Sequence, residues 1–316
     1  MTDGENRIER GRIERYRNLE LLARQVVEGF IVGLHKSPFH GFSVEFSEHR
    51  LYNSGESTKH IDWKLYGRTD KMFVKTFEEE TNLRCQIVID TSRSMYYPLE
   101  RHNNIDHPNK LTFAVYAAAV LVEMLHRQRD AFGLALVSDR IELQTPLHSR
   151  TVHQNYVYGQ LEKLLSPADV DNLTPQSTHI ADPLHQLAEQ LHRRSLVALF
   201  TDALFDDAEQ ERLFDAVRHL RHCKHEVILF HLLDRQHEID LRFDNRPHLF
   251  VDMESGRRLK LSPSAVAEKY ADAMKKRMNG IRQRAVQHNV DYVEVDVDKG
   301  FDQVLQPYLY KRTKML

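Results

Sequence analysis

The feature of this sequence that most constrains its fold is a regular alternation of short apolar runs with longer amphipathic segments. Runs with the length and composition of buried strands lie at residues 85–89, 133–137, 196–200, 226–233 and 292–297. Helical periodicity is found at residues 111–128, 151–165, 182–194, 207–222 and 265–288, and in a last segment that ends near Tyr310. This alternation predicts an α/β fold in which helices cover both faces of a mostly parallel sheet.

Two segments depart from the alternation. Residues 141–145 follow the strand at 133–137 so closely that the two must pair antiparallel, which predicts one antiparallel edge strand. Near residues 249–261, a Ser-Gly pair stands between two β-prone runs and indicates a hairpin inserted before the next helix.

The N-terminal part of the chain has a different character. Apolar residues recur at helical spacing from Arg17 to Leu34, which predicts an amphipathic helix that packs on something larger. From Ser37 to Thr81, glycines interrupt short β-prone pieces, so we expect an irregular β-rich subdomain. The predicted division is therefore residues 1–81, a helix and a β-rich part, and residues 82–316, the sheet domain.

Charge and cysteine content restrict the partners and the compartment. The chain has 44 basic and 46 acidic residues, which removes the usual electrostatic reason to expect a nucleic-acid partner. The longest apolar stretch, Leu111–Val122, is too short for a transmembrane helix. The N-terminus has no apolar signal-peptide core, and the two cysteines, Cys85 and Cys223, are not closely spaced. These features predict a cytoplasmic protein.

Polar side chains gather where the predicted strands end. Asp90, Ser92 and Ser94 follow the first strand of the alternation at alternate positions, and Asp202 follows the strand at 196–200. Thr178 precedes a predicted helix and offers a further hydroxyl. In open α/β sheets, ligands bind outside the carboxyl ends of the strands. The alternative is structural: Asp90 to Ser94 would form an Asx-type turn, and Thr178 would cap the helix.

Carboxylates beside hydroxyls suit a hard cation. Magnesium prefers oxygen ligands, keeps some of its water, and is held by few protein groups. We therefore expect Mg²⁺, or Mn²⁺ or Ca²⁺ in its place, with an open position that a partner carboxylate can fill.

The residues Asp90-Thr91-Ser92-Arg93-Ser94-Met95, with Thr178 and Thr201-Asp202 downstream, resemble the metal-ion-dependent adhesion site of von Willebrand factor A domains. The run from Gly55 to Thr81 is similar to the signature of the bacterial domain-of-unknown-function family 58 (DUF58), in which von Willebrand factor A-like proteins are found. Glu56 and Lys59 differ from the Asp and Arg of many relatives.

This resemblance implies a von Willebrand factor A-like fold and a role for each site residue. The hydroxyls of Ser92, Ser94 and Thr178 would touch the metal, and the carboxylates of Asp90 and Asp202 would act largely through water. It also implies a non-enzymatic adaptor for a MoxR-type AAA+ ATPase or its client, because such proteins commonly accompany these ATPases.

Two other functions stay open. A magnesium-dependent phosphoryl-transfer enzyme would use Asp90 as its nucleophile, but Ser92 stands where such an enzyme normally has a second carboxylate. A metal-free scaffold would bind its partners through the N-terminal helix and the hairpin. Motifs for P-loop, dinucleotide, serine-hydrolase and zinc-protease chemistry are missing from the sequence.

Three further patterns have a simpler interpretation. His219, His222 and Cys223 share a helical face, but we interpret them as surface residues at a helix end. Asp206 and Glu209 indicate the start of a helix. The basic residues of the long helix at 265–288 are interpreted as a solvated face: Lys275, Lys276, Arg277, Arg282 and Arg284.

Overall fold

The chain forms two compact units in this computed structural model, one of residues 31–82 and one that joins residues 1–30 to 83–316. The structure describes residues 19–36, 49–51, 73–75, 83–166, 179–203, 206–244, 246–253 and 256–315. In the smaller unit, β1 (His49–Leu51) and β2 (Phe73–Lys75) pair antiparallel. The other residues of the predicted β-rich segment, Trp63 among them, lie outside the described residues.

The larger unit is built on a six-stranded sheet with the strand order β10-β7-β6-β3-β4-β5. Every neighbouring pair is parallel except β4 and β5, which pair antiparallel at the edge. This confirms the predicted α/β fold and its antiparallel edge strand. The strands are β3 (Arg84–Asp90), β4 (Ala131–Val137), β5 (Ile141–Gln144), β6 (Leu196–Thr201), β7 (Glu226–Leu233) and β10 (Asp291–Asp296).

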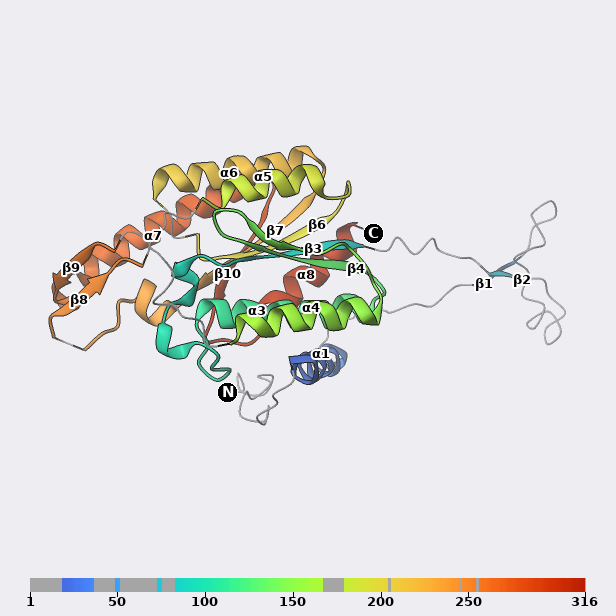
Figure 1. Cartoon of the computed structure of the whole chain (residues 1–316), viewed down its shortest axis with the longest axis horizontal. Coiled ribbons are helices and arrows are strands. Elements are labelled where there is room, and N and C mark those ends of the chain that lie inside the picture. Colours follow the sequence, from blue (N-terminus) through green and yellow to red (C-terminus); the bar gives the residue numbers. More distant parts are fainter. Residues whose placement is uncertain are drawn as a thin grey trace. The chain divides into compact units, whose positions relative to one another are not determined.

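Helices cover both faces of this sheet (Figure 1). One face is covered by α5 (Ala181–Gln190), α6 (Asp207–His222) and α7 (Pro263–Gln287). The other carries α3 (Lys110–Arg127), α4 (Thr151–Leu164) and α8 (Asp302–Met315). Every residue of α3 from Lys110 to Leu125 is buried, so this helix is an internal element rather than an amphipathic cover.

The first helix, α1 (Leu19–Lys36), belongs to the larger unit up to Phe30. Its residues Leu22, Val26 and Phe30 are buried, and Glu28 forms an ion pair with Arg127 of α3 at 2.9 Å. The predicted division placed this helix together with the β-rich segment in residues 1–81. In the structure, its apolar face is buried in the larger unit.

Two expectations about local elements meet different outcomes. The hairpin is confirmed as β8 (His248–Val251) and β9 (Arg258–Leu261), which pair antiparallel. The helix expected to reach Arg194 instead ends at Gln190, because the next residue, Leu191, has an extended backbone with a φ of -71° and a ψ of 145°. None of the helices in the described parts of the chain combines the length and hydropathy needed to cross a membrane.

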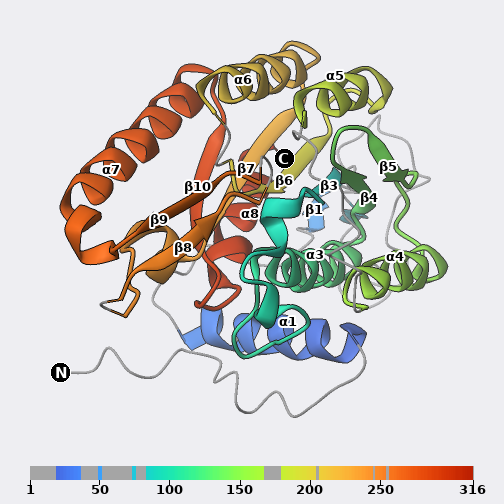
Figure 2. The ribbon, with the colours of Figure 1, turned by 60° about the vertical axis from the view of Figure 1, so that its left-hand side comes forward.

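The sheet contains a topological switch point between β3 and β6. From β3 the chain crosses through α3 to β4 on one side, whereas β6 lies on the other side of β3 and continues into α6 on the opposite face. The segment after β3, teal in Figure 2, lies beside the loops that follow β6 and β7, and carries η3 (Arg93–Tyr96) and η4 (Leu99–Arg101). Connections that leave in opposite directions open a crevice at this edge, where α/β proteins bind ligands.

Candidate metal-binding site at the carboxyl edge of the sheet

Asp90, the last residue of β3, is fully buried at the switch point. Its Oδ2 accepts a hydrogen bond from Thr201 Oγ1 at 2.7 Å, and its Oδ1 accepts one from the backbone N–H of Ser92 at 2.9 Å. Burial, followed by the nearby Asp202 carboxylate, raises the pKa of Asp90 to about 7. The Asx-type turn is therefore present, and it fixes the carboxylate in place.

The two serines belong to the same loop. Ser92 Oγ and Ser94 Oγ lie 3.1 Å apart, and the Ser94 hydroxyl contributes to lowering the pKa of Asp202. Asp202 is fully buried directly after β6. The next residue, Ala203, has a φ of 46°, a conformation that is uncommon without glycine and that clusters at functional loops.

An ammonium group completes the cluster, which consists of Asp90, Ser92, Ser94, Thr201, Asp202, Glu238 and Lys110. Lys110 is 1% exposed, and its Nζ donates to Asp202 Oδ2 at 2.7 Å and to Glu238 Oε1 at 2.6 Å. Burial would lower the pKa of Lys110, but Asp202 and Glu238 outweigh burial and raise it, so the ammonium stays charged. Burial likewise favours a higher pKa for Asp202, but the ammonium and the Ser94 hydrogen bond lower that pKa overall.

Local structure explains how a lysine comes to lie here. Asn109 caps α3 by accepting a hydrogen bond from the Thr112 N–H at 2.8 Å. The Asn109 side chain also donates to the Tyr96 carbonyl at 2.9 Å, which ties the helix to the loop after β3. This places the first residue of α3, Lys110, under the ends of β6 and β7.

The structure thus brings together four of the five predicted ligand residues at this edge of the sheet: Asp90, Ser92, Ser94 and Asp202. Thr178 lies outside the described residues. The sequence analysis named Thr201 only as part of the motif and gave it no role, and it missed Lys110 and Glu238 as members of the cluster. The one available signal was Lys110, a charged residue at the head of the most apolar stretch in the chain.

The side chains present fit a hard divalent cation. All candidate ligands are carboxylate or hydroxyl oxygens, the donors that magnesium prefers and zinc does not. Where the chain is described, no three His, Cys, Asp or Glu side chains form a metal-binding group, so a cation here would depend on the serine hydroxyls. With Asp90, Asp202 and Glu238 all ionised, the three carboxylates and the one ammonium leave two negative charges, which one divalent cation would balance.

The other patterns found in the sequence have structural partners. Asp206 caps α6 by accepting from the Glu209 N–H at 2.8 Å, as expected. His219 Nδ1 lies 2.9 Å from His185 Nδ1 on α5, so its neighbour is a histidine of the adjacent helix. Within the basic segment of α7, Arg277 is half-buried rather than solvated, whereas Lys275 is exposed.

Comparison with known proteins places the chain in a family. Residues 48–279 match the family model described as "Protein of unknown function DUF58". "Uncharacterized protein Rv1480" of Mycobacterium tuberculosis and "Uncharacterized protein Mb1516" of Mycobacterium bovis are each 24% identical over 241 residues, which cover 76% of this chain and 70% of each relative.

Among solved structures, the conserved hypothetical protein BatB from Bacteroides thetaiotaomicron has 15% identity and a TM-score of 0.46, over 74% of this chain and 98% of that chain. A von Willebrand factor type A structure from Catenulispora acidiphila has 13% identity and a TM-score of 0.33, over 48% of this chain and 33% of that chain. Because the family model spans most of its length, this chain belongs to the DUF58 family.

Proposed function

We propose that this protein is a non-enzymatic interaction module that uses a divalent cation to bind a carboxylate of a protein partner. The observation that carries the proposal is the convergence of Asp90, Ser92, Ser94 and Asp202 at the switch point of the sheet, where Thr201, the neighbour of Asp202, donates to Asp90. These residues would hold Mg²⁺, or Mn²⁺ or Ca²⁺ in its place, and Thr178 is the proposed fifth ligand.

Each residue of the cluster has a task in this proposal. The cation, when bound, supplies the positive charge that attracts the partner carboxylate. Thr201 and the Ser92 N–H orient Asp90, and Lys110 orients Asp202. Because Lys110 already neutralises part of the carboxylate charge, the protein alone binds the ion only moderately, and a partner carboxylate adds the missing negative ligand.

The partner is proposed from the family resemblance: a MoxR-type AAA+ ATPase or its client. Binding rather than turnover is favoured because Ser92 stands where a phosphoryl-transfer enzyme normally has a second carboxylate as its acid or base.

A metal-free scaffold is the second candidate, and Lys110 is the observation that favours it. The Nζ of Lys110 already gives Asp202 a cationic partner at 2.7 Å, so the cluster has internal charge compensation without a metal. In that case the cluster would serve stability, and partner binding would not respond to a chelator.

Capture of partners from native lysate, with Mg²⁺ or with chelator, separates the two candidates. The module predicts capture that requires Mg²⁺ and is lost in Asp90→Ala. Asp139→Ala is the matched control, since Asp139 is an exposed carboxylate at the end of β4. Equal capture by all three proteins in chelator would contradict the cation-dependent function and leave the scaffold.

A further inference from the structure

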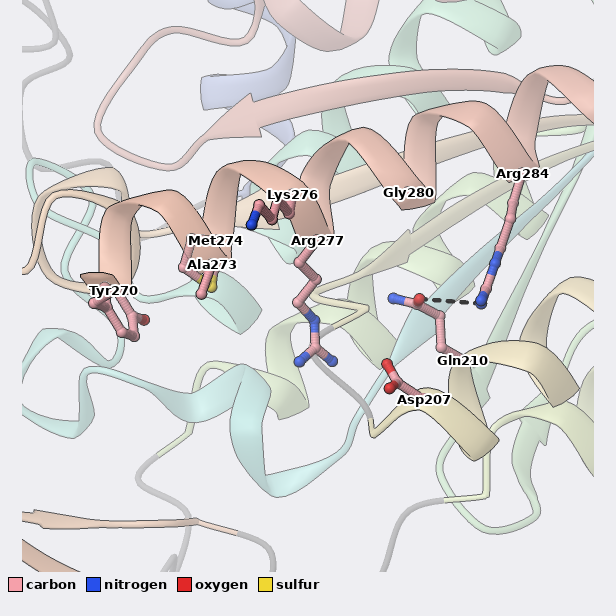
Figure 3. Close-up of a pocket in the computed structure, with 9 residues that line it drawn as sticks. All are labelled: Asp207, Gln210, Tyr270, Ala273, Met274, Lys276, Arg277, Gly280 and Arg284. Atoms are coloured by element: carbon pink, nitrogen blue, oxygen red, sulfur yellow. Dashed lines mark hydrogen bonds between the residues drawn. The ribbon is translucent and has the colours of Figure 1, made fainter. Parts of the chain in front are cut away.

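A basic pocket lies between α6 and α7 (Figure 3). Its volume is about 470 Å³, and its charged lining residues are Asp207, Lys276, Arg277 and Arg284. Tyr270, also in the lining, donates its hydroxyl to the Glu238 carbonyl at 2.7 Å. Because the Glu238 side chain accepts from Lys110, one chain of contacts joins the pocket to the candidate cation site.

Arg277 is the unusual member of the pocket. Its Nε and Nη2 are buried and have no hydrogen-bond partner in the described parts of the protein. Arg284, by contrast, donates to Gln210 Oε1 at 3.1 Å, an interaction drawn in Figure 3. Buried polar groups are nearly always paired, and an unpaired guanidinium edge is costly, so this edge is suited to a ligand.

The chemistry of the edge defines that ligand. Nε and Nη2 form one side of a planar guanidinium and match the two oxygens of a carboxylate. The lining has three cationic side chains and a single carboxylate, Asp207, in a chain whose formal net charge is -2. Asp207 would repel a doubly charged phosphate more strongly than a singly charged carboxylate.

We infer that this pocket binds an acidic side chain of a protein partner through Arg277. The inference rests on the proposed function in one respect: the same partner would place a second carboxylate on the cation. The partner would therefore present an acidic segment that spans both positions, with Arg277 as a specificity-determining residue.

The test is fluorescence anisotropy with a rhodamine-labelled peptide of five glutamates, titrated with the full chain in chelator and in Mg²⁺. The variant is Arg277→Gln, and the matched control is Lys275→Gln, which removes an exposed charge from the same helix outside the pocket. We expect Arg277→Gln to weaken binding roughly tenfold or more in both buffers, the effect of losing a charge-assisted bidentate contact. Lys275→Gln should change it less than about twofold.

Two further variants distinguish failure of the pocket from failure of the cation site. Arg277→Lys keeps the charge but loses the planar edge, so it should also bind more weakly; it serves in place of Arg277→Gln if circular dichroism shows that the glutamine variant is misfolded. Asp90→Ala should lose only the increase in affinity produced by Mg²⁺. If Mg²⁺ adds nothing while Arg277→Gln still weakens binding, the pocket is supported and the cation-dependent function fails.

Three results would overturn the inference. They are equal affinity of Arg277→Gln and Lys275→Gln, no measurable binding of the peptide by the wild-type chain, and displacement of the peptide by inorganic phosphate at lower concentration than by acetate. The last would assign the pocket to phosphate rather than to an acidic segment.

Discussion

Replacement of Lys110 by methionine would test how the buried ammonium and a divalent cation share the cluster. The side chain is 1% exposed and bridges Asp202 and Glu238 at 2.7 and 2.6 Å. Methionine fills similar volume but leaves two carboxylates without their cation. Removing one partner of a buried ion pair costs about 3–5 kcal/mol. In chelator, we therefore expect Lys110→Met to be less stable than wild type by that amount.

Added Mg²⁺ should reverse most of this loss. Without the ammonium the cluster is more negative by one charge, so the variant should bind Mg²⁺ more tightly than wild type. A ligand at a hundred times its dissociation constant stabilises the folded state by about 2.7 kcal/mol. The increase in unfolding free energy on adding Mg²⁺ should thus be larger for Lys110→Met than for wild type.

The assay is urea unfolding followed by circular dichroism, with and without Mg²⁺. The control is Lys163→Met, because Lys163 is an exposed lysine of α4. The reasoning would be refuted if Lys110→Met were as stable as Lys163→Met in chelator. It would equally be refuted if Mg²⁺ stabilised wild type and Lys110→Met by the same amount.

Three further predictions concern Asp90. Because the pKa of Asp90 is raised to about 7, its protonated form favours folding. In chelator, this contribution to the unfolding free energy is fully present below the pH at which an ordinary carboxyl group titrates, and it is lost as pH rises through about 7. Mg²⁺ needs the ionised form, so its affinity should increase up to about pH 7 and then level off; a flat profile by calorimetry would contradict this. Thr201→Val should cost about 1.5–3 kcal/mol in urea unfolding, since it removes a hydrogen bond to a buried carboxylate. Thr201→Ser keeps the hydroxyl and should restore most of that loss, so equal stability of the two variants would count against the role of this bond.

The fold was predictable because hydrophobic periodicity is a local property of the chain. The six strands of the sheet and the helices α3 to α8 occur where the sequence indicates them, apart from the earlier end of α5, since each buried strand shows as a continuous apolar run. The convergence of Asp90 and Asp202 followed from one general rule, that parallel strands present their carboxyl ends at one edge.

The residues that adjust the charge of the site were not predictable in this way. Lys110 meets its partners Asp202 and Glu238 across separations of 92 and 128 residues, and no local pattern encodes such pairings. Periodicity likewise places Arg277 on α7 but does not show that part of its guanidinium is buried. Burial of polar groups is a tertiary property, so it appears only when the elements are packed.

Isothermal titration of the chelator-treated protein with Mg²⁺ tests the central claim most directly. We predict saturable binding at one site in wild type and in Asp139→Ala, and no binding in Asp90→Ala, with circular dichroism confirming that both variants fold. Wild-type protein that takes up none of Mg²⁺, Mn²⁺ and Ca²⁺ would contradict the claim, because the ammonium of Lys110 would then compensate the charge of the cluster without a metal ion.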